Sequence, residues 1–204
     1  MDSFHELKLN PAYIYLILAT CLIISFIFDT KIVYFFYELR NLSIILLPLM
    51  TFLSSPILIG LIIFYILFLD LKSKNYVSAF ALAFSFSLAA LSSLLIKNLT
   101  LRQRPYSKFN FNTTEPRNSY SFPSNHTASV YSTLKFFPKN SLKWIFYILL
   151  ILIPISRLYL EVHYLSDLFM GVIVGLLASD IIVYLEKNHK LISKLVALLK
   201  LDRV

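Results

Sequence analysis

The chain of 204 residues contains a single cysteine, and it lacks several other common signatures. Cys21 lies inside an apolar run, which excludes an internal disulfide and a metal site built from thiolates. The first apolar run is not followed by a small-residue cleavage site, so we expect a retained helix rather than a signal peptide. The sequence also shows no internal repeat and no low-complexity segment, and we therefore expect one domain over residues 1–204.

Apolar residues are abundant instead. They make up 58% of the chain, with a mean hydropathy of +0.72, whereas soluble proteins contain roughly 45–50% apolar residues. This composition predicts an integral membrane protein. The net charge of +8 lies mostly in short segments between apolar runs, as juxtamembrane charges do, so no nucleic-acid partner is expected.

The apolar runs predict an all-α fold, a six-span transmembrane helix bundle with short interfacial helices. The expected spans cover residues 12–28, 50–69, 76–96, 124–137, 142–156 and 164–185. Pro48 and Pro56 predict a broken turn before the second span, and the short fourth span predicts a helix buried in the bundle. Gly171 and Gly175 form a G-x-x-x-G pattern that favours close helix packing. The remaining segments are expected to be an interfacial helix at 31–41, a loop at 97–123 and an amphipathic surface helix at 188–201.

The distribution of basic residues predicts an orientation. With an inside N-terminus, the expected inside segments hold 11 of the 19 Lys and Arg residues. Because cytoplasmic segments carry the excess of such residues, we expect the N-terminus and the C-terminus in the cytoplasm. The polar loops 97–123 and 157–163 then face outward, toward the periplasmic or extracellular side of a bacterial inner (plasma) membrane.

One polar stretch between two apolar runs carries candidate catalytic residues. Ionisable side chains are costly in a membrane and usually functional, and residues 156–167 contain Arg157, His163 and Asp167. In a helix that starts near His163, the i,i+4 spacing brings Asp167 within hydrogen-bond reach of the imidazole. The carboxylate fixes the ring tautomer and leaves the other nitrogen free as a nucleophile or base, while the Arg157 guanidinium suits phosphate. The alternative is a His and an Asp that cap a helix at the membrane surface.

Three separated segments meet on the outward side in this topology: 97–105, 123–126 and 156–167. Taken singly, their polar residues have ordinary explanations as interfacial anchors, a helix N-cap or a snorkelling side chain. Their joint spacing is K-x6-R-P from Lys97, P-S-x-H from Pro123, and S-R-x5-H-x3-D from Ser156. This pattern resembles the type 2 phosphatidic acid phosphatase superfamily, and the resemblance covers about residues 97–167 directly.

The resemblance implies a role for each matching residue. His163 would attack phosphorus to give a phosphohistidine, Asp167 would orient its ring, and His126 would protonate the leaving oxygen. The groups expected to bind the phosphate are Lys97, Arg104, Ser124, Asn125 and Arg157. No metal ion and no cofactor is implied, and the outward loops lack the clustered carboxylates that hold Mg²⁺.

Asn125 stands where the family usually has Gly. Asn is among the non-Gly residues that tolerate positive φ, so we expect the backbone turn to survive while the side chain adds bulk and donors beside the phosphate. Some bacterial members that act on undecaprenyl diphosphate resemble this chain in carrying a polar residue here. Asn125 therefore favours that substrate.

The expected partner is a lipid phosphate that arrives laterally in the bilayer. The leading interpretation is a phosphatase of undecaprenyl diphosphate, with phosphatidylglycerol phosphate and lipid A 1-phosphate as alternative substrates. A second interpretation is a lipid phosphotransferase, which would pass the phosphoryl group from the same histidine to another lipid. A third is a non-enzymatic transporter built on intramembrane Arg, His and Asp, although the chain lacks inverted repeats.

Overall fold

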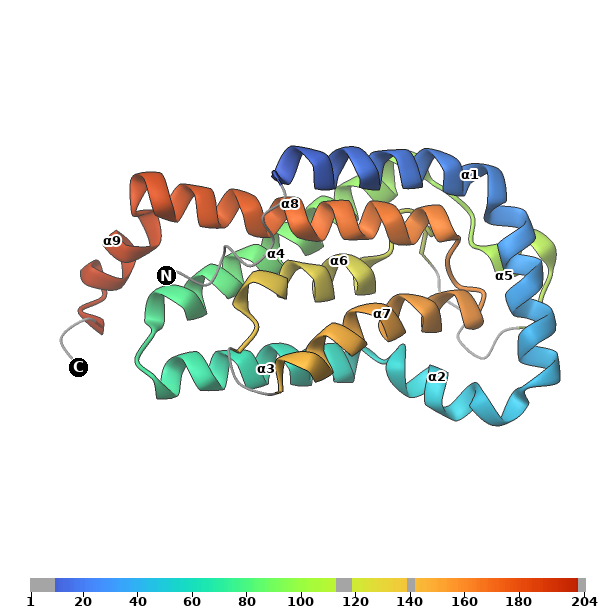
Figure 1. The fold of residues 1–204 in the computed structure, drawn as a ribbon, viewed down its shortest axis with the longest axis horizontal. Coiled ribbons are helices and arrows are strands. Elements are labelled where there is room, and N and C mark those ends of the chain that lie inside the picture. Colours follow the sequence, from blue (N-terminus) through green and yellow to red (C-terminus); the bar gives the residue numbers. More distant parts are fainter. Residues whose placement is uncertain (1–9, 113–118, 139–141, 202–204) are drawn as a thin grey trace.

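The structure is a computed structural model that describes residues 10–112, 119–138 and 142–201 (Figure 1). All regular structure in these ranges is helical, without a strand, so the predicted all-α class is confirmed. Part of the expected loop, 113–118, lies outside the described residues, as do Lys8, Arg117, Lys139 and Arg203 of the charge count. The elements are α1 (Pro11–Leu42), η2 (Ile44–Leu46), α2 (Leu47–Leu53), α3 (Pro56–Lys72), α4 (Tyr76–Thr100), α5 (Pro105–Phe109), α6 (Asn125–Ser132), η3 (Leu134–Phe136), α7 (Lys143–Tyr159), α8 (Leu165–His189) and α9 (Leu191–Leu198).

The long helices form an elongated bundle, with α8 packed against α1, α4 and α6 (Figure 1). The helices α4 and α7 run toward the end of the bundle that carries α5, whereas α3, α6 and α8 run away from it. The α3–α4 connection and α9 lie at the opposite end. The bundle therefore has two distinct ends, and the connection between α7 and α8 lies at the end near α5.

Helix α1 corrects the prediction of a separate interfacial helix. The first expected span and segment 31–41 form one continuous helix of 32 residues, because neither Pro nor Gly interrupts the sequence between them. The ribbon of α1 turns near its middle, and its second half runs across the end of the bundle (Figure 1). Asp29 does not end the helix at a membrane surface, because its carboxylate is buried and accepts hydrogen bonds from α8.

The predicted break before the second span is present, but its position differs. Helices α2 and α3 are separated at Ser54 and Ser55, so residues 50–53 belong to α2, and the segment Ile44–Leu53 is bent by 43° from α3. Pro56 occupies the first turn of α3, where a missing N–H costs nothing, and the Ser55 side chain accepts from Ile57 N at 3.1 Å. The break therefore results from local capping chemistry.

Six spans are not confirmed. Within the described residues, three stretches are long and apolar enough to cross a membrane: α1, the stretch Tyr76–Phe109 that contains α4, and α8. The bent pair Ile44–Leu53 and Pro56–Lys72 would form a fourth. Helix α7 has 17 residues and α6 has eight, which correspond to about 26 Å and about 12 Å against a hydrocarbon core of about 30 Å.

The G-x-x-x-G pattern packs as predicted, against α6. A Cβ atom on Gly171 would lie 2.8 Å from the Ser124 carbonyl oxygen, and one on Gly175 would lie 2.5 Å from the Ala128 carbonyl oxygen. These distances are shorter than any van der Waals contact, so only glycine allows α8 to approach α6 this closely. Helix α6 is largely buried, which confirms the prediction of a helix inside the bundle.

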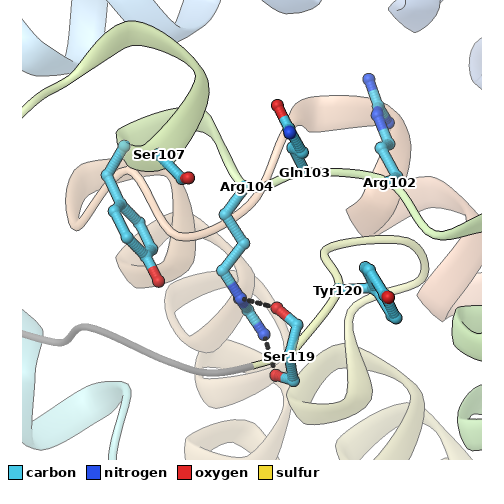
Figure 2. A pocket seen from close by; sticks show the side chains of 7 residues that line it. Arg102, Gln103, Arg104, Ser107, Ser119 and Tyr120 are labelled. Atoms are coloured by element: carbon cyan, nitrogen blue, oxygen red, sulfur yellow. Dashed lines mark hydrogen bonds between the residues drawn. The ribbon is translucent and has the colours of Figure 1, made fainter.

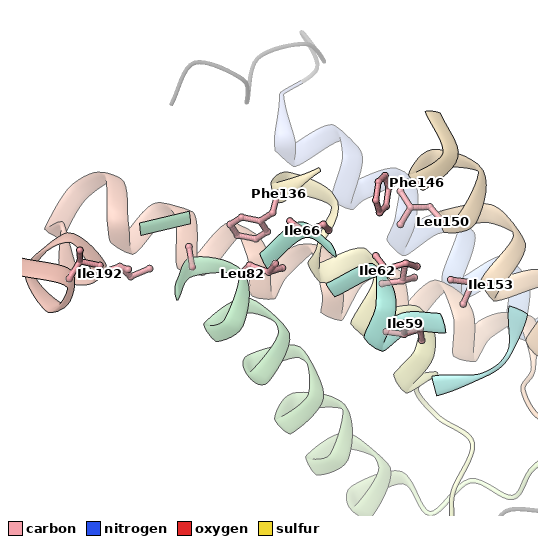
Figure 3. Packing of buried hydrophobic residues seen from close by; sticks show 12 residues of the cluster. Ile59, Ile62, Ile66, Leu82, Phe136, Phe146, Leu150, Ile153 and Ile192 are labelled. Carbon is pink, nitrogen blue, oxygen red and sulfur yellow. The ribbon is translucent and has the colours of Figure 1, made fainter. Parts of the chain in front are cut away.

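One apolar cluster occupies the part of the bundle away from α5, and a smaller one, of Tyr159, Leu160 and Val162, packs at the α5 end. Ile59, Ile62 and Ile66 of α3 pack with Leu82 of α4 and with aromatic and aliphatic residues of η3, α7 and α9 (Figure 3). Many other large apolar side chains are exposed, including Leu16 (63%), Ile57 (71%) and Leu91 (65%). An exposed apolar surface of this kind is expected where lipid replaces water, which agrees with an integral membrane protein.

The expected surface helix begins later than predicted. Helix α8 continues to His189, and Lys190, at φ 50°, separates it from α9. The Glu186 carboxylate accepts from Ile192 N at 2.8 Å and thereby caps α9, while Ile192 and Val196 are buried against the core. The apolar face of α9 is thus partly covered by the bundle itself.

Candidate active site

The sequence-predicted residues gather at the end of the bundle near α5. Four of them stand at helix termini: Lys97 in the last turn of α4, Ser124 at the N-cap of α6, Arg157 in the last turn of α7, and Asp167 in the first turn of α8. Because helix N-termini present free N–H groups and carry a partial positive charge, this arrangement favours an anion.

His163 lies between a carboxylate and a guanidinium. Its Nδ1 is 3.2 Å from Asp167 Oδ2, and its Nε2 is 3.2 Å from Arg104 Nη1. One neutral tautomer satisfies both neighbours: Nδ1–H donates to the carboxylate, and the Nε2 lone pair accepts from Arg104. The predicted contact with Asp167 is therefore present, although His163 precedes α8 by two residues.

The surroundings of His163 favour the neutral imidazole. The pKa of His163 is lowered well below 6.5, first by burial of the ring and then by nearby charges, from Arg104, Lys97, Arg157 and His126 in that order. Residues from all three sequence motifs thus act electrostatically on one ring. A neutral histidine whose Nε2 carries no proton is the form that attacks an electrophile, once phosphate takes the hydrogen bond from Arg104.

The three cations are held by different parts of the chain. Lys97 Nζ donates to the carbonyl oxygens of Tyr120 and Ser121 at 2.7 and 3.1 Å. Arg157 is fully buried and donates from Nη1 to the side chain of Ser54 and, at 3.2 Å, to its carbonyl oxygen. The break between α2 and α3 therefore contacts the site, which the sequence did not indicate.

Arg104 lines a pocket. Its Nε donates to the Ser119 carbonyl at 2.8 Å and its Nη2 to the Ser119 hydroxyl at 2.9 Å (Figure 2). The pocket has a volume of about 320 Å³, and its wall also includes Arg102, Gln103, Tyr106, Ser107 and Tyr120. Figure 2 shows that Arg102 and Arg104 leave the chain on opposite sides, as residues two apart do in an extended segment.

The P-S-x-H segment forms the start of α6. Ser124 is fully buried, its hydroxyl accepts from Thr127 Oγ1 at 3.0 Å, and its N–H donates to the Asp167 carbonyl at 2.9 Å. This last bond joins the second motif to the third. Asn125 is the first residue of α6 and does not adopt positive φ, so the reason given above for tolerating Asn in place of Gly is wrong. What distinguishes Asn125 is its side chain, whose buried Oδ1 accepts no hydrogen bond from the described residues.

Two ion-pairing residues near the site were not predicted. Arg102 donates to Asp167 Oδ1 and to Asp29 Oδ2, each at 2.7 Å. Asp29 comes from α1 and is 3% exposed. An acidic residue at the end of an apolar run was the available signal, because an intramembrane carboxylate usually has a partner. The identity of that partner depends on tertiary packing.

A second buried ion pair supports the α7–α8 connection. Arg40 Nη1 of α1 lies 2.6 Å from Glu161 Oε2, and the Glu161 side chain is completely buried. Glu161 adopts φ 50°, and its carbonyl oxygen accepts from Tyr106 N at 3.1 Å. Burial raises the pKa of Glu161 to about 7, against the opposing effect of Arg40. The second half of α1 and α5 therefore both hold the segment that precedes His163.

Metal ligands are not gathered in the described ranges. No group of three or more His, Cys, Asp or Glu side chains is placed there to hold a metal ion. The charged groups around His163 are instead the guanidinium and ammonium groups described above.

Together, the helical fold and this site define a membrane protein with a His–Asp pair inside a cluster of cations. Residues 78–190, more than half of the chain, match the family model of the PAP2 superfamily. The chain belongs to the PAP2 superfamily, and it is a phosphatase. The predicted family is therefore confirmed.

Two solved structures are similar to this chain. The chain is similar to LpxE of Aquifex aeolicus, with 23% identity and a TM-score of 0.58 over 74% of this chain and 93% of that one. It is also similar to a transmembrane PAP2-type phosphatidylglycerolphosphate phosphatase from Bacillus subtilis, with 19% identity and a TM-score of 0.44 over 83% and 97%. No curated protein matches the chain. The likeness to LpxE shows the fold.

Proposed function

We propose that this protein is a lipid phosphate phosphatase that acts through a phosphohistidine at His163. The observation that carries the proposal is the position of the imidazole, with Nδ1 beside the Asp167 carboxylate and Nε2 beside Arg104. The lone pair of Nε2 thus points toward a guanidinium that suits a phosphate oxygen. A bound phosphate would accept hydrogen bonds from that guanidinium, and its phosphorus would then lie near Nε2.

The proposed reaction has two steps. In the first, His163 Nε2 forms a bond to phosphorus while the bond to the leaving oxygen breaks, and His126 gives that oxygen a proton. In the second, water forms a bond to phosphorus and gives a proton to His126, which restores its protonated form, while the P–N bond breaks and inorganic phosphate leaves. Lys97, Arg104 and Arg157 would neutralise the phosphate oxygens, and Ser124 and Asn125 would bind them at the start of α6.

The leading substrate in this proposal is undecaprenyl diphosphate. Asn125 supports it, since the side chain places an unsatisfied amide oxygen and two donors at the start of α6. A water molecule or substrate group that carries a proton fits this oxygen better than a fully ionised phosphate does. A partly protonated phosphate or the leaving group of a diphosphate provides such a proton.

We place the site at the outer face of a bacterial inner membrane, with both termini in the cytoplasm. The described lysines of the α3–α4 connection and of α9 lie at the end opposite the site, in agreement with the charge bias (Figure 1). In this arrangement residues 1–204 form one domain of six crossing segments. Helix α6 with η3 would cross inside the bundle, shielded from lipid by its neighbours.

Phosphate release from purified protein tests the function. The full chain in detergent is assayed with undecaprenyl diphosphate, phosphatidylglycerol phosphate and lipid A 1-phosphate, beside His163→Gln and a control, Lys108→Met, on the exposed face of α5. We expect release by the wild type and the control, none by His163→Gln, and the highest kcat/KM for undecaprenyl diphosphate. Radiolabel that appears on a second lipid would indicate a phosphotransferase, and an absence of release from every substrate would contradict the proposal.

A further inference from the structure

The carboxylate of Asp167 has contacts on both oxygens. Oδ2 accepts from Tyr164 N at 2.9 Å and lies 3.2 Å from His163 Nδ1. Oδ1 accepts from Arg102 Nη1 at 2.7 Å. The side of Asp167 that faces away from His163 is thus held by a residue that none of the three motifs assigns to the site.

Arg102 connects Asp167 to Asp29 of α1. Its Nη2 donates to Asp29 Oδ2 at 2.7 Å, and its Nη1 also donates to Ser166 Oγ at 2.6 Å. Ser166 in turn donates to Asp29, from N to Oδ1 at 2.9 Å and from Oγ to Oδ2 at 2.5 Å. Two carboxylates, one guanidinium and one serine therefore form a closed network, and Asp29, Ser166 and Asp167 are all buried.

The network satisfies the N-terminus of α8. The first N–H groups of a helix have no partner within the helix, and here Tyr164 N donates to Asp167 and Ser166 N donates to Asp29. The partial positive charge at this terminus favours both carboxylates. Asp29 thus caps α8 from another helix, which links the position of α1 to the first turn of α8.

Aromatic rings hold Arg102 in place. Its guanidinium carbon lies 3.9 Å from the centre of the Tyr164 ring, with the rings of Phe26 and Phe122 at 5.3 and 5.9 Å. Such contacts are favourable for a planar guanidinium, and they limit the positions that the side chain adopts. A lysine would supply the charge but not the fork that spans two carboxylates.

We infer that Arg102 and Asp29 are positioning residues, which hold the Asp167 carboxylate in the orientation that sets the tautomer of His163. The inference rests on the proposed function in taking His163 as the nucleophile. Neither residue touches the phosphate in this arrangement. Their effect passes through Asp167: the Arg102 charge favours its ionised form, and the two residues together hold the carboxylate at hydrogen-bond distance from Nδ1.

The charges around the Asp167–His163 pair determine how removal of Arg102 changes the affinity of the pair for a proton. Titratable and charged groups from several elements face the pair: Asp29 of α1, Lys97 of α4, Arg102 and Arg104 after α4, His126 of α6, and Arg157 of α7. Tyr164, before α8, acts on Asp167 through a hydrogen bond from its backbone N–H. Loss of the Arg102 charge makes uptake of a proton by the pair more favourable, whichever member holds it. Loss of the Asp29 charge makes that uptake less favourable.

Because Arg102→Met and Asp29→Asn should change the proton affinity of the pair in opposite directions, the two variants test the inference together. In both variants we expect kcat for a soluble phosphate ester to fall by roughly 10–100-fold, the usual cost of losing an outer-shell partner. KM should change little because the phosphate-binding cations remain. The acidic limb of kcat/KM should move to higher pH in Arg102→Met, but should stay in place or move to lower pH in Asp29→Asn. Arg102→Lys should recover part of kcat, and it replaces Arg102→Met if that variant does not insert.

A spectroscopic measurement keeps this inference separate from the phosphatase proposal. Nitrogen NMR of protein labelled at histidine, assigned with His163→Gln, reports the tautomer without turnover. We expect Nδ1–H in the wild type and a mixed or protonated ring in Arg102→Met, while the control Lys108→Met leaves the signals unchanged. Wild-type signals and wild-type kcat in both Arg102→Met and Asp29→Asn would overturn the inference, whether or not His163 is the nucleophile.

Discussion

Gly171→Ala should damage the site through the packing of α8 on α6. The new Cβ would lie 2.8 Å from the Ser124 carbonyl oxygen and 2.9 Å from Thr127 Cβ. Carbon atoms in contact are normally at least about 3.5 Å apart, so the start of α6 must move by about 0.6 Å. The nearest atom belongs to the backbone, and rotation of a side chain does not relieve the clash.

The displaced segment, the start of α6, carries residues of the site. Ser124 begins the helix that carries Asn125 and His126, and its N–H donates to the Asp167 carbonyl. Overpacking costs about 1–3 kcal/mol of stability, and misplacement of a reacting group by about 1 Å costs about 10²-fold in rate. We therefore expect kcat/KM to fall at least about tenfold, with a lower melting temperature in detergent.

Gly60→Ala is the matched control. A Cβ on Gly60 of α3 meets no atom within 4 Å, and alanine is favoured over glycine in a helix by up to about 1 kcal/mol. Its melting temperature and kcat/KM should equal or exceed those of the wild type. If Gly171→Ala had the same kcat/KM as Gly60→Ala, the close approach of α6 and α8 would not be required for the site.

Three further predictions follow from the site. Because burial and nearby cations hold the pKa of His163 well below 6.5, the titration of His163 should not produce an acidic limb of kcat/KM centred near 6.5 after correction for substrate ionisation; a limb that is centred there and coincides with a change in the tautomer signals of His163 at the same pH would contradict this. Asn125→Gly should retain activity on soluble phosphates but change the ratio of kcat/KM between diphosphate and monophosphate lipids, and an unchanged ratio would remove the support for undecaprenyl diphosphate. Excess chelator should leave turnover unchanged while vanadate inhibits, since cationic side chains neutralise the phosphate; recovery of lost activity by Mg²⁺ would refute it.

Local sequence patterns predicted much of the fold. The spacing of Gly171 and Gly175 gave the correct packing face, and the polar, short segment at 124–137 gave the correct buried helix. The apolar runs located the long helices, but not all of their ends. The first expected span ends at residue 28, whereas α1 continues through Asp29, whose charge is compensated inside the protein by Ser166 and Arg102.

The site was predicted in part. Motif spacing identified the residues that surround His163, and the contact with Asp167 follows from a separation of four residues. The contacts of Arg102 with Asp29 and of Arg157 with Ser54 join residues 73 and 103 positions apart. Local periodicity carries no information about such pairs, since they depend on how the helices pack. Their roles, like those of the predicted residues, remain predictions.

Direct detection of a phosphoenzyme tests the central claim. Enzyme is mixed with a radiolabelled phosphate substrate and quenched in alkali, because the P–N bond is labile in acid, and the labelled residue is located by mass spectrometry of its peptides. We predict phosphate on His163 in the wild type, more of it in His126→Ala if hydrolysis of the intermediate depends on that residue, and none in His163→Gln. Label on His126, or turnover that persists in His163→Gln, would contradict the account.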